Sequence, residues 1–95
     1  MAESQRKSER VPFTKPVRIL KPTPMDGKGL DIASGGMGLE VPQAIAEGTA
    51  VELELFGGTV VQGTVRKVLP GSAGGFRLGV QFAKEDPGLV AKAQA

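Results

Sequence analysis

Residues 51–69 read VELELFGGTVVQGTVRKVL, and this stretch determines the fold class. In Val51–Leu55 apolar residues alternate with glutamates, which is the pattern of a strand with one buried face. Gly57-Gly58 then supplies a turn, and residues 59–69 continue as a second and longer strand. Gly63 interrupts this second strand, so we expect a bulge or a bend there. The stretch therefore predicts a β-hairpin.

Short strands of the same kind are expected on both sides of the hairpin. Asp26-Gly27 is typical of a hairpin turn, and Ser34-Gly35-Gly36 breaks the chain before a further strand. Leu30 and Ile32 are expected on one face of their strand. Together these patterns predict about six short strands separated by turns. Besides the hairpin, the strand segments are residues 17–19, 29–32, 37–41 and 76–82.

The remaining segments are a connection and a C-terminal helix. Residues 42–48 link two strands and have room for one helical turn. Asp86-Pro87 resembles an N-cap followed by proline at the first helical position, so a short helix should follow. Closure of the strands leaves no edge exposed, so we predict an all-β fold, a small six-stranded antiparallel β-barrel. The expected core consists of apolar side chains at alternating positions: Met37, Leu39, Val51, Leu53, Leu55, Val65, Leu78, Val80 and Phe82.

The composition excludes several classes of site. The 95 residues are enough for one domain, and they contain no cysteine, histidine, tyrosine or tryptophan. A disulfide scaffold, a zinc site built from cysteine and histidine, and a histidine-dependent catalytic triad are therefore excluded. We therefore expect that the protein is not an enzyme and that it has neither a metal site nor a cofactor.

Neither a membrane span nor a signal peptide is expected. No segment approaches the run of about 18 apolar residues that a transmembrane helix needs. The first residues, MAESQRKSER, lack the apolar segment of a signal peptide. We therefore expect a cytoplasmic protein without membrane insertion and without an attached output domain.

Positive charge is concentrated at the N-terminal end. The net charge is +2, but residues 1–22 contain six basic and two acidic side chains. The other 73 residues contain six basic and eight acidic side chains. This asymmetry indicates either an anionic partner that docks near the N-terminus or a solvated basic tail. The first residues also lack an apolar face. We therefore divide the chain into a flexible basic arm, residues 1–11, and a barrel with its helix, residues 12–95.

Two local features have the chemistry of a nucleotide site. Arg6 and Arg10 lie in the arm, and each offers a planar fork of donors that binds phosphate bidentately and can stack on a flat ring. Asp31 is followed by small residues and a glycine turn at residues 33–36. A carboxylate accepts hydrogen bonds from base amino groups, and glycine lets a bulky ligand approach the backbone. Together these features suit a purine nucleotide with exposed phosphates.

The same features resemble the PilZ domain family. Its pattern is RxxxR in an N-terminal arm, followed by [D/N]xSxxG at a strand end of the barrel. The sequence has Arg6-x-x-x-Arg10 and then Asp31-Ile32-Ala33-Ser34-Gly35-Gly36. The segment 75–82 also resembles the last strand of that family, so the likeness covers residues 6–88. The resemblance implies a PilZ-like barrel that binds the bacterial second messenger cyclic di-GMP.

In that family the two arginines clamp phosphates and guanine faces, while the acid and the serine read a guanine edge. The resemblance assigns these roles to Arg6, Arg10 and Asp31, and the motif glycine to Gly36. The serine position holds Ala33, and the neighbouring Ser34 is one residue out of register, although a turn allows it partial substitution. One lost hydrogen bond costs about 0.5–1.5 kcal/mol, so binding is expected to weaken rather than to vanish.

Three functions remain open from the sequence. In the leading one, the arm wraps cyclic di-GMP and an unidentified effector protein reads the new surface of a monomer or weak dimer. In the second, favoured by Ala33, a PilZ-like adaptor binds no nucleotide and acts through protein contacts in motility or pilus regulation. The third is a small nucleic-acid-binding barrel. It is disfavoured because Phe76 and Phe82 belong to the core pattern, which leaves few aromatic side chains for stacking. We expect no nucleic acid polymer as partner, and we interpret Arg66 and Lys67 as ordinary surface charge.

Overall fold

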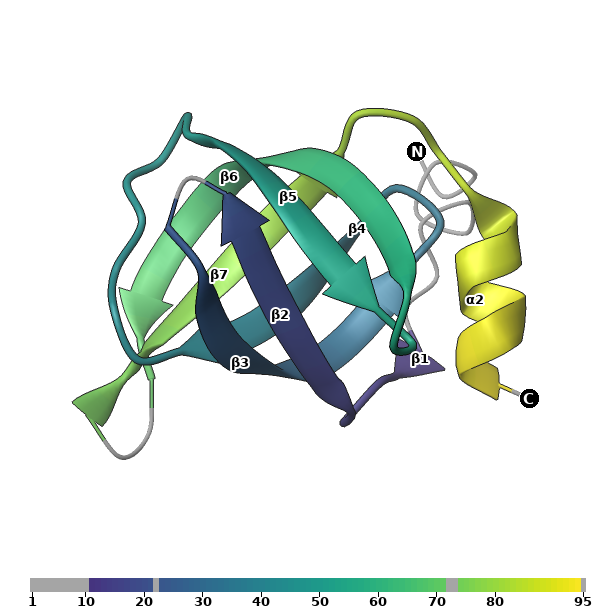
Figure 1. Ribbon diagram of the computed structural model, residues 1–95, viewed down its shortest axis with the longest axis horizontal. Coiled ribbons are helices and arrows are strands. Elements are labelled where there is room, and N and C mark those ends of the chain that lie inside the picture. The colour runs from purple at the N-terminus through teal and green to yellow at the C-terminus, as the bar shows by residue number, and fades with distance from the viewer. Residues whose placement is uncertain (1–10, 22, 72–73, 95) are drawn as a thin grey trace, which may run out of the picture.

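The computed structural model describes residues 11–21, 23–71 and 74–94. Within these ranges the chain forms one antiparallel sheet of seven strands and a C-terminal helix (Figure 1). The all-β class predicted from the alternating pattern is confirmed. The strands are β1 (Val11–Pro12), β2 (Pro16–Lys21), β3 (Met25–Ala33), β4 (Gly36–Val41), β5 (Ala50–Leu55), β6 (Thr59–Pro70) and β7 (Phe76–Phe82), and the helix is α2 (Pro87–Gln94).

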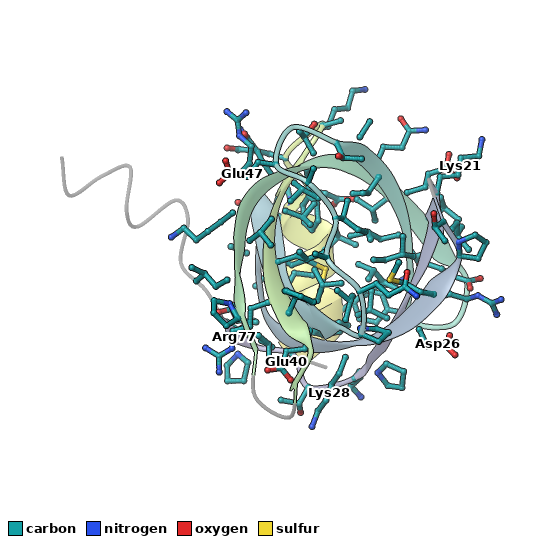
Figure 2. The ribbon with its side chains drawn as sticks, turned by 90° about the vertical axis from the view of Figure 1, so that its left-hand side faces the viewer. Lys21, Asp26, Lys28, Glu40, Glu47 and Arg77 are labelled. Atoms are coloured by element: carbon teal, nitrogen blue, oxygen red, sulfur yellow. The ribbon has the colours of Figure 1, made fainter. Side chains whose placement is uncertain are left out.

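Six of these strands close into a barrel. They follow the order β3-β2-β5-β6-β7-β4, and β4 returns to pair with β3, so each strand of the ring has two antiparallel neighbours. The short β1 is additional and pairs with β3 on the same edge as β2. Figure 2 looks into the barrel and shows charged side chains such as Lys28 and Arg77 on the outside of the ring. The predicted six-stranded barrel is therefore confirmed.

Apolar side chains from the alternating positions fill the interior of the barrel. Every side chain predicted for the core is buried. Phe13, Ile45 and Leu89 are also buried, although they lie outside the alternating strands. Phe13 packs edge-on against Phe56 with the ring centroids 5.2 Å apart, a favourable arrangement for an aromatic pair. The core therefore includes connections and the helix as well as the strands.

The helix α2 is capped at its start and packed against the barrel. The backbone amide of Gly88 donates to Oδ1 of Asp86 at 3.0 Å, which confirms the predicted N-cap. Leu89 is buried, and the Lys92 ammonium lies over the Phe56 ring, 5.2 Å from its centroid. Contacts of α2 with β1 and β3 place it over one end of the barrel (Figure 1).

Asp26-Gly27 does not form the predicted hairpin turn. Both residues lie inside β3, where Gly27 pairs with Val17 of β2, and the chain reverses before Met25. A Cβ atom on Gly27 would lie only 2.7 Å from the carbonyl oxygen of Glu40 in β4. Gly27 is therefore required because β3 and β4 approach closely at this position. It is not part of a turn.

The bulge in β6 also differs from the expectation. The register shifts between Val65 and Lys67, so the extra residue is Arg66 and not Gly63. A Cβ atom on Gly63 would lie 2.6 Å from the carbonyl oxygen of Gln81. Gly63 is therefore needed for the close packing of β6 on β7, and the register on both sides of it shows no bulge there.

Two smaller expectations are corrected as well. The β3–β4 register shifts between Gly29 and Asp31, so Leu30 and Ile32 do not share a face. Ile32 is fully buried, whereas Leu30 is partly exposed. Residues 42–48 form an irregular connection without the helical turn for which there was room.

We expect Gly63→Ala to destabilise the barrel by about 1–3 kcal/mol, because the added methyl group overlaps the backbone of β7. Gly58→Ala is the matched control, since a Cβ atom there has no heavy atom within 4 Å. Denaturant midpoints of the two variants are compared by far-ultraviolet circular dichroism, because the chain has no tryptophan for fluorescence. Equal midpoints would contradict the close contact.

Candidate functional site

Asp31 belongs to the outer face of the barrel near the end of β3. It is opposite Gly38 in the β3–β4 register, and the adjacent Ile32 is fully buried on the inner face. Oδ1 of Asp31 accepts a hydrogen bond from the backbone amide of Gly38 at 3.0 Å. The sheet itself therefore holds this carboxylate in a defined position over β4.

The remaining residues of the predicted motif form the connection from β3 to β4. Ala33 ends β3 on the same face as Asp31, because the inward-facing Ile32 separates them. Ser34 lies in the turn, and its carbonyl oxygen accepts a hydrogen bond from the amide of Asp86 at 2.8 Å. A Cβ atom on Gly36 would overlap the carbonyl oxygen of Val80, so only glycine lets β4 lie against β7 here.

The basic arm is attached to the barrel beside this segment. Val11 is opposite Ile32 and Pro12 is opposite Asp31 in the β1–β3 register. Arg6 and Arg10 lie outside the described residues, and so does the predicted flexible arm apart from Val11. The end of the arm that joins the barrel is therefore next to the Asp31 segment in space.

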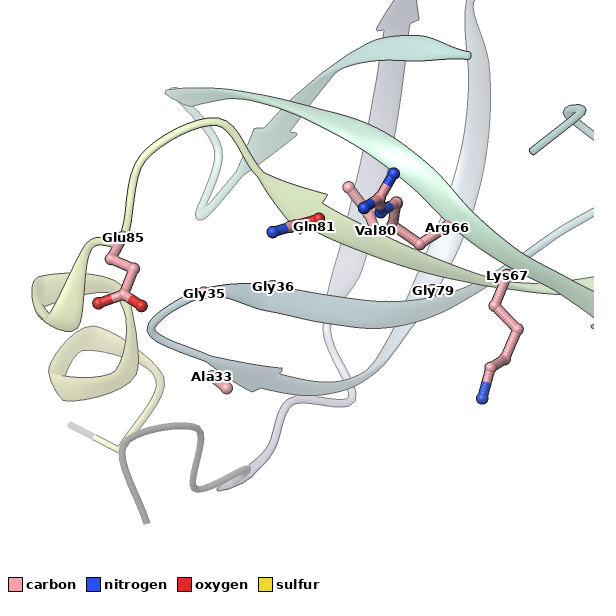
Figure 3. A pocket seen from close by; sticks show the side chains of 9 residues that line it. All are labelled: Ala33, Gly35, Gly36, Arg66, Lys67, Gly79, Val80, Gln81 and Glu85. Carbon is pink, nitrogen blue, oxygen red and sulfur yellow. The ribbon is translucent and has the colours of Figure 1, made fainter. Parts of the chain in front are cut away.

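A cavity of about 380 Å³ opens beside the β3–β4 turn. Backbone forms much of its floor, because three of the lining residues are glycines. Figure 3 shows Glu85 at one end, near the turn, and Arg66 and Lys67 towards the other end. The cavity therefore has an acidic end and a basic end. It is lined by Ala33, Gly35, Gly36, Arg66, Lys67, Gly79, Val80, Gln81 and Glu85.

Arg66 and Lys67 are the two cationic side chains of the cavity, and the sequence analysis does not place them in a site. Both are exposed, as expected of surface charge, but they also line the cavity. The sequence signal is the order Val65-Arg66-Lys67-Val68, in which two polar residues, in place of one, separate apolar residues. Such a break in the alternation indicates a bulge, and a bulge leaves two consecutive side chains on one face.

The charged groups of this surface do not form a metal centre. Across residues 11–21, 23–71 and 74–94, no group of three or more acidic side chains could hold a metal ion. The same ranges contain no helix that is long and apolar enough to span a membrane. The charged side chains that line the cavity, Arg66, Lys67 and Glu85, can offer an incoming molecule ion pairs and hydrogen bonds.

Comparison with known proteins identifies the fold family. The profile of the PilZ domain matches residues 4–94. The chain belongs to the PilZ domain family. Among solved structures, this PilZ domain is similar to the Bacillus subtilis inhibitor of motility MotI/DgrA, with a TM-score of 0.68 and 14% sequence identity. The match covers 94% of this chain but 46% of that chain, and at this low identity the likeness is one of fold alone. A search of curated proteins gives no significant match.

Asp31→Ala should lower the stability of this PilZ domain by about 1–3 kcal/mol, because the partly buried amide of Gly38 loses its acceptor. Asp31→Asn keeps an oxygen at the same position and should cost much less. Urea midpoints measured for the two variants test this difference. If both variants lose the same stability, the hydrogen bond to Gly38 does not fix the carboxylate.

Proposed function

We propose that this PilZ domain is a receptor for cyclic di-GMP and that it has no catalytic role. The ligand is a cyclic dinucleotide with two phosphates and two guanines. Its site would combine Arg6 and Arg10 of the arm with Asp31, Ala33 and Gly36 of the barrel. The proposal is supported by the family and by the cavity beside the β3–β4 turn.

The observation that carries the proposal is the register of β1 on β3. Val11 lies opposite Ile32, one residue before Ala33 of the cavity wall. Arg10 is bonded directly to Val11, and Arg6 is within about 17 Å of it even for an extended chain, at roughly 3.5 Å per residue. Both motifs can therefore meet on one ligand without any rearrangement of the barrel.

The residue types of the proposed site match the chemistry of a guanine nucleotide. Arginine binds phosphate through parallel hydrogen bonds and stacks on a base. The carboxylate of Asp31 faces outward, where it can accept hydrogen bonds from the amino edge of guanine. The glycine floor lets a flat ligand lie close to the backbone.

A ligand held between arm and barrel would change the surface around β1 and the β3–β4 turn. We propose that a separate effector protein reads this surface and that the domain works in the cytoplasm as a monomer or weak dimer. A second candidate is an adaptor that acts through protein contacts without nucleotide. Ala33 favours it, because no hydroxyl at this wall position can bind a guanine edge.

Calorimetric titration with cyclic di-GMP tests the proposed function. We expect wild type to bind, Arg10→Ala to abolish measurable binding and Arg6→Ala to weaken it strongly, because each charge-assisted bond to phosphate is worth about 1.5–3 kcal/mol. Arg18→Ala is the matched control. Arg18 is exposed on β2, opposite Glu54 of β5, and it does not line the cavity.

Absence of binding by wild type would overturn this function and favour the adaptor. If wild type binds and Arg10→Ala gives the same affinity as Arg18→Ala, the ligand does not use the arm.

Ala33→Ser should tighten cyclic di-GMP binding several-fold, because one added hydrogen bond contributes about 0.5–1.5 kcal/mol. The new hydroxyl would lie on the cavity wall on the same face as Asp31. Ser34→Ala is the control and should leave affinity unchanged, since Ser34 lies in the turn. Both variants are titrated with cyclic di-GMP. If Ala33→Ser leaves the affinity unchanged and Ser34→Ala weakens it, Ser34 has taken the role of the motif serine.

A further inference from the structure

The bulge in β6 places two adjacent basic side chains on the outer face of the barrel. Val65 pairs with Val80 of β7, and Lys67 pairs with Gly79, so Arg66 is the extra residue between them. Val65 is fully buried, whereas Arg66 and Lys67 are both exposed. In a regular strand one of the two would point into the core. The bulge therefore doubles the positive charge at this position.

These two cations are not used by the fold. Neither Arg66 nor Lys67 lies within ion-pair distance of a carboxylate in the part of the chain that the structure describes. Two other basic side chains are engaged: Arg77 Nε lies 3.5 Å from Oε2 of Glu40, and Lys92 donates to Thr59. The charge of the Arg66–Lys67 pair is therefore available to an anion.

Lys67 is the last residue of a row that crosses four neighbouring strands. Asp31 of β3 is opposite Gly38 of β4, Gly38 is opposite Gly79 of β7, and Gly79 is opposite Lys67 of β6. Residues paired across a sheet point to the same face, so this row has a carboxylate at one end, an ammonium at the other and bare backbone between them. Three strand spacings of roughly 4.8 Å separate the two ends by about 14 Å.

We propose that Arg66 and Lys67 are a second anion-binding wall, which holds phosphate oxygens of the cyclic dinucleotide from the barrel side. The inference rests on the proposed function and adds two residues that neither sequence motif contains. A guanine nucleotide has the same polarity as the row, with amino donors on one base edge and anionic oxygens on its phosphates. The carboxylate of Asp31 then takes the donor edge, the glycines lie beneath the ring, and the Arg66–Lys67 pair neutralises charge.

The test compares two double variants of the full chain in calorimetric titrations with cyclic di-GMP. The Arg66→Gln/Lys67→Gln variant should bind about tenfold or more weakly than wild type, since each removed cation is a charge-assisted contact. Its affinity should also depend less steeply on salt, because fewer charges remain to be screened. The Arg18→Gln/Lys21→Gln variant removes the same two charges from β2, which lies across the ring from β7, and should bind like wild type.

The variants also separate this inference from the function on which it rests. If wild type does not bind cyclic di-GMP, the proposed function is refuted, and the proposed role of Arg66 and Lys67 is refuted with it. If wild type binds and both double variants match it, the function stands and the Arg66–Lys67 wall is refuted. The charge-retaining Arg66→Lys/Lys67→Arg variant checks the fold, because it changes the same bulge residues. It should keep near-wild-type affinity, and a tenfold loss in this variant would refute an electrostatic role.

Discussion

Closure of the sheet between β3 and β4 is the constraint on which the rest of the structure depends. It gives every strand of the ring two hydrogen-bonded neighbours, and it encloses the apolar side chains in the interior of the barrel. Neighbouring backbones of the barrel also lie closer together than side chains permit at several glycines, among them Gly27, Gly36 and Gly63. The high glycine content is therefore in part a packing requirement, and it is not a sign of loose structure.

The same constraint shapes the candidate site. Gly36 is needed for β4 to lie on β7, and together with Gly79 it leaves the outer surface there without side chains. The bulge at Arg66, which interrupts the β6–β7 register, adds charge at the edge of that bare area. A flat, glycine-rich floor with charged borders thus follows from how the barrel closes, and its residues come from strands that are distant in sequence.

Much of the fold could be predicted because period-2 alternation reports directly on which face is buried. The strand of Val51, Leu53 and Leu55 and its neighbours were predictable for this reason, and so was the cap at Asp86. Glycines were harder to interpret, because a glycine looks the same in sequence whether it turns the chain or lets another strand approach. Asp26-Gly27 was misassigned on that ground. The candidate site stays a prediction. Its local motif could be located in the sequence because Asp31 and Ala33 lie on one strand, but the position of Arg66 and Lys67 near it depends on strand pairing across the barrel.

The position of β1 outside the closed ring has a consequence for the local stability of the sheet. Its pairing with β3 can be lost while all the pairings of the ring remain, since β3 is held by β2 on the same edge and by β4 on the other. Phe13, buried just after β1, marks where such an opening would stop. Sub-global opening of this kind requires less free energy than global unfolding. Val11 and Pro12 can therefore separate from β3 and pair with it again while the barrel stays closed, so the rate of this local opening is independent of how rarely the barrel unfolds.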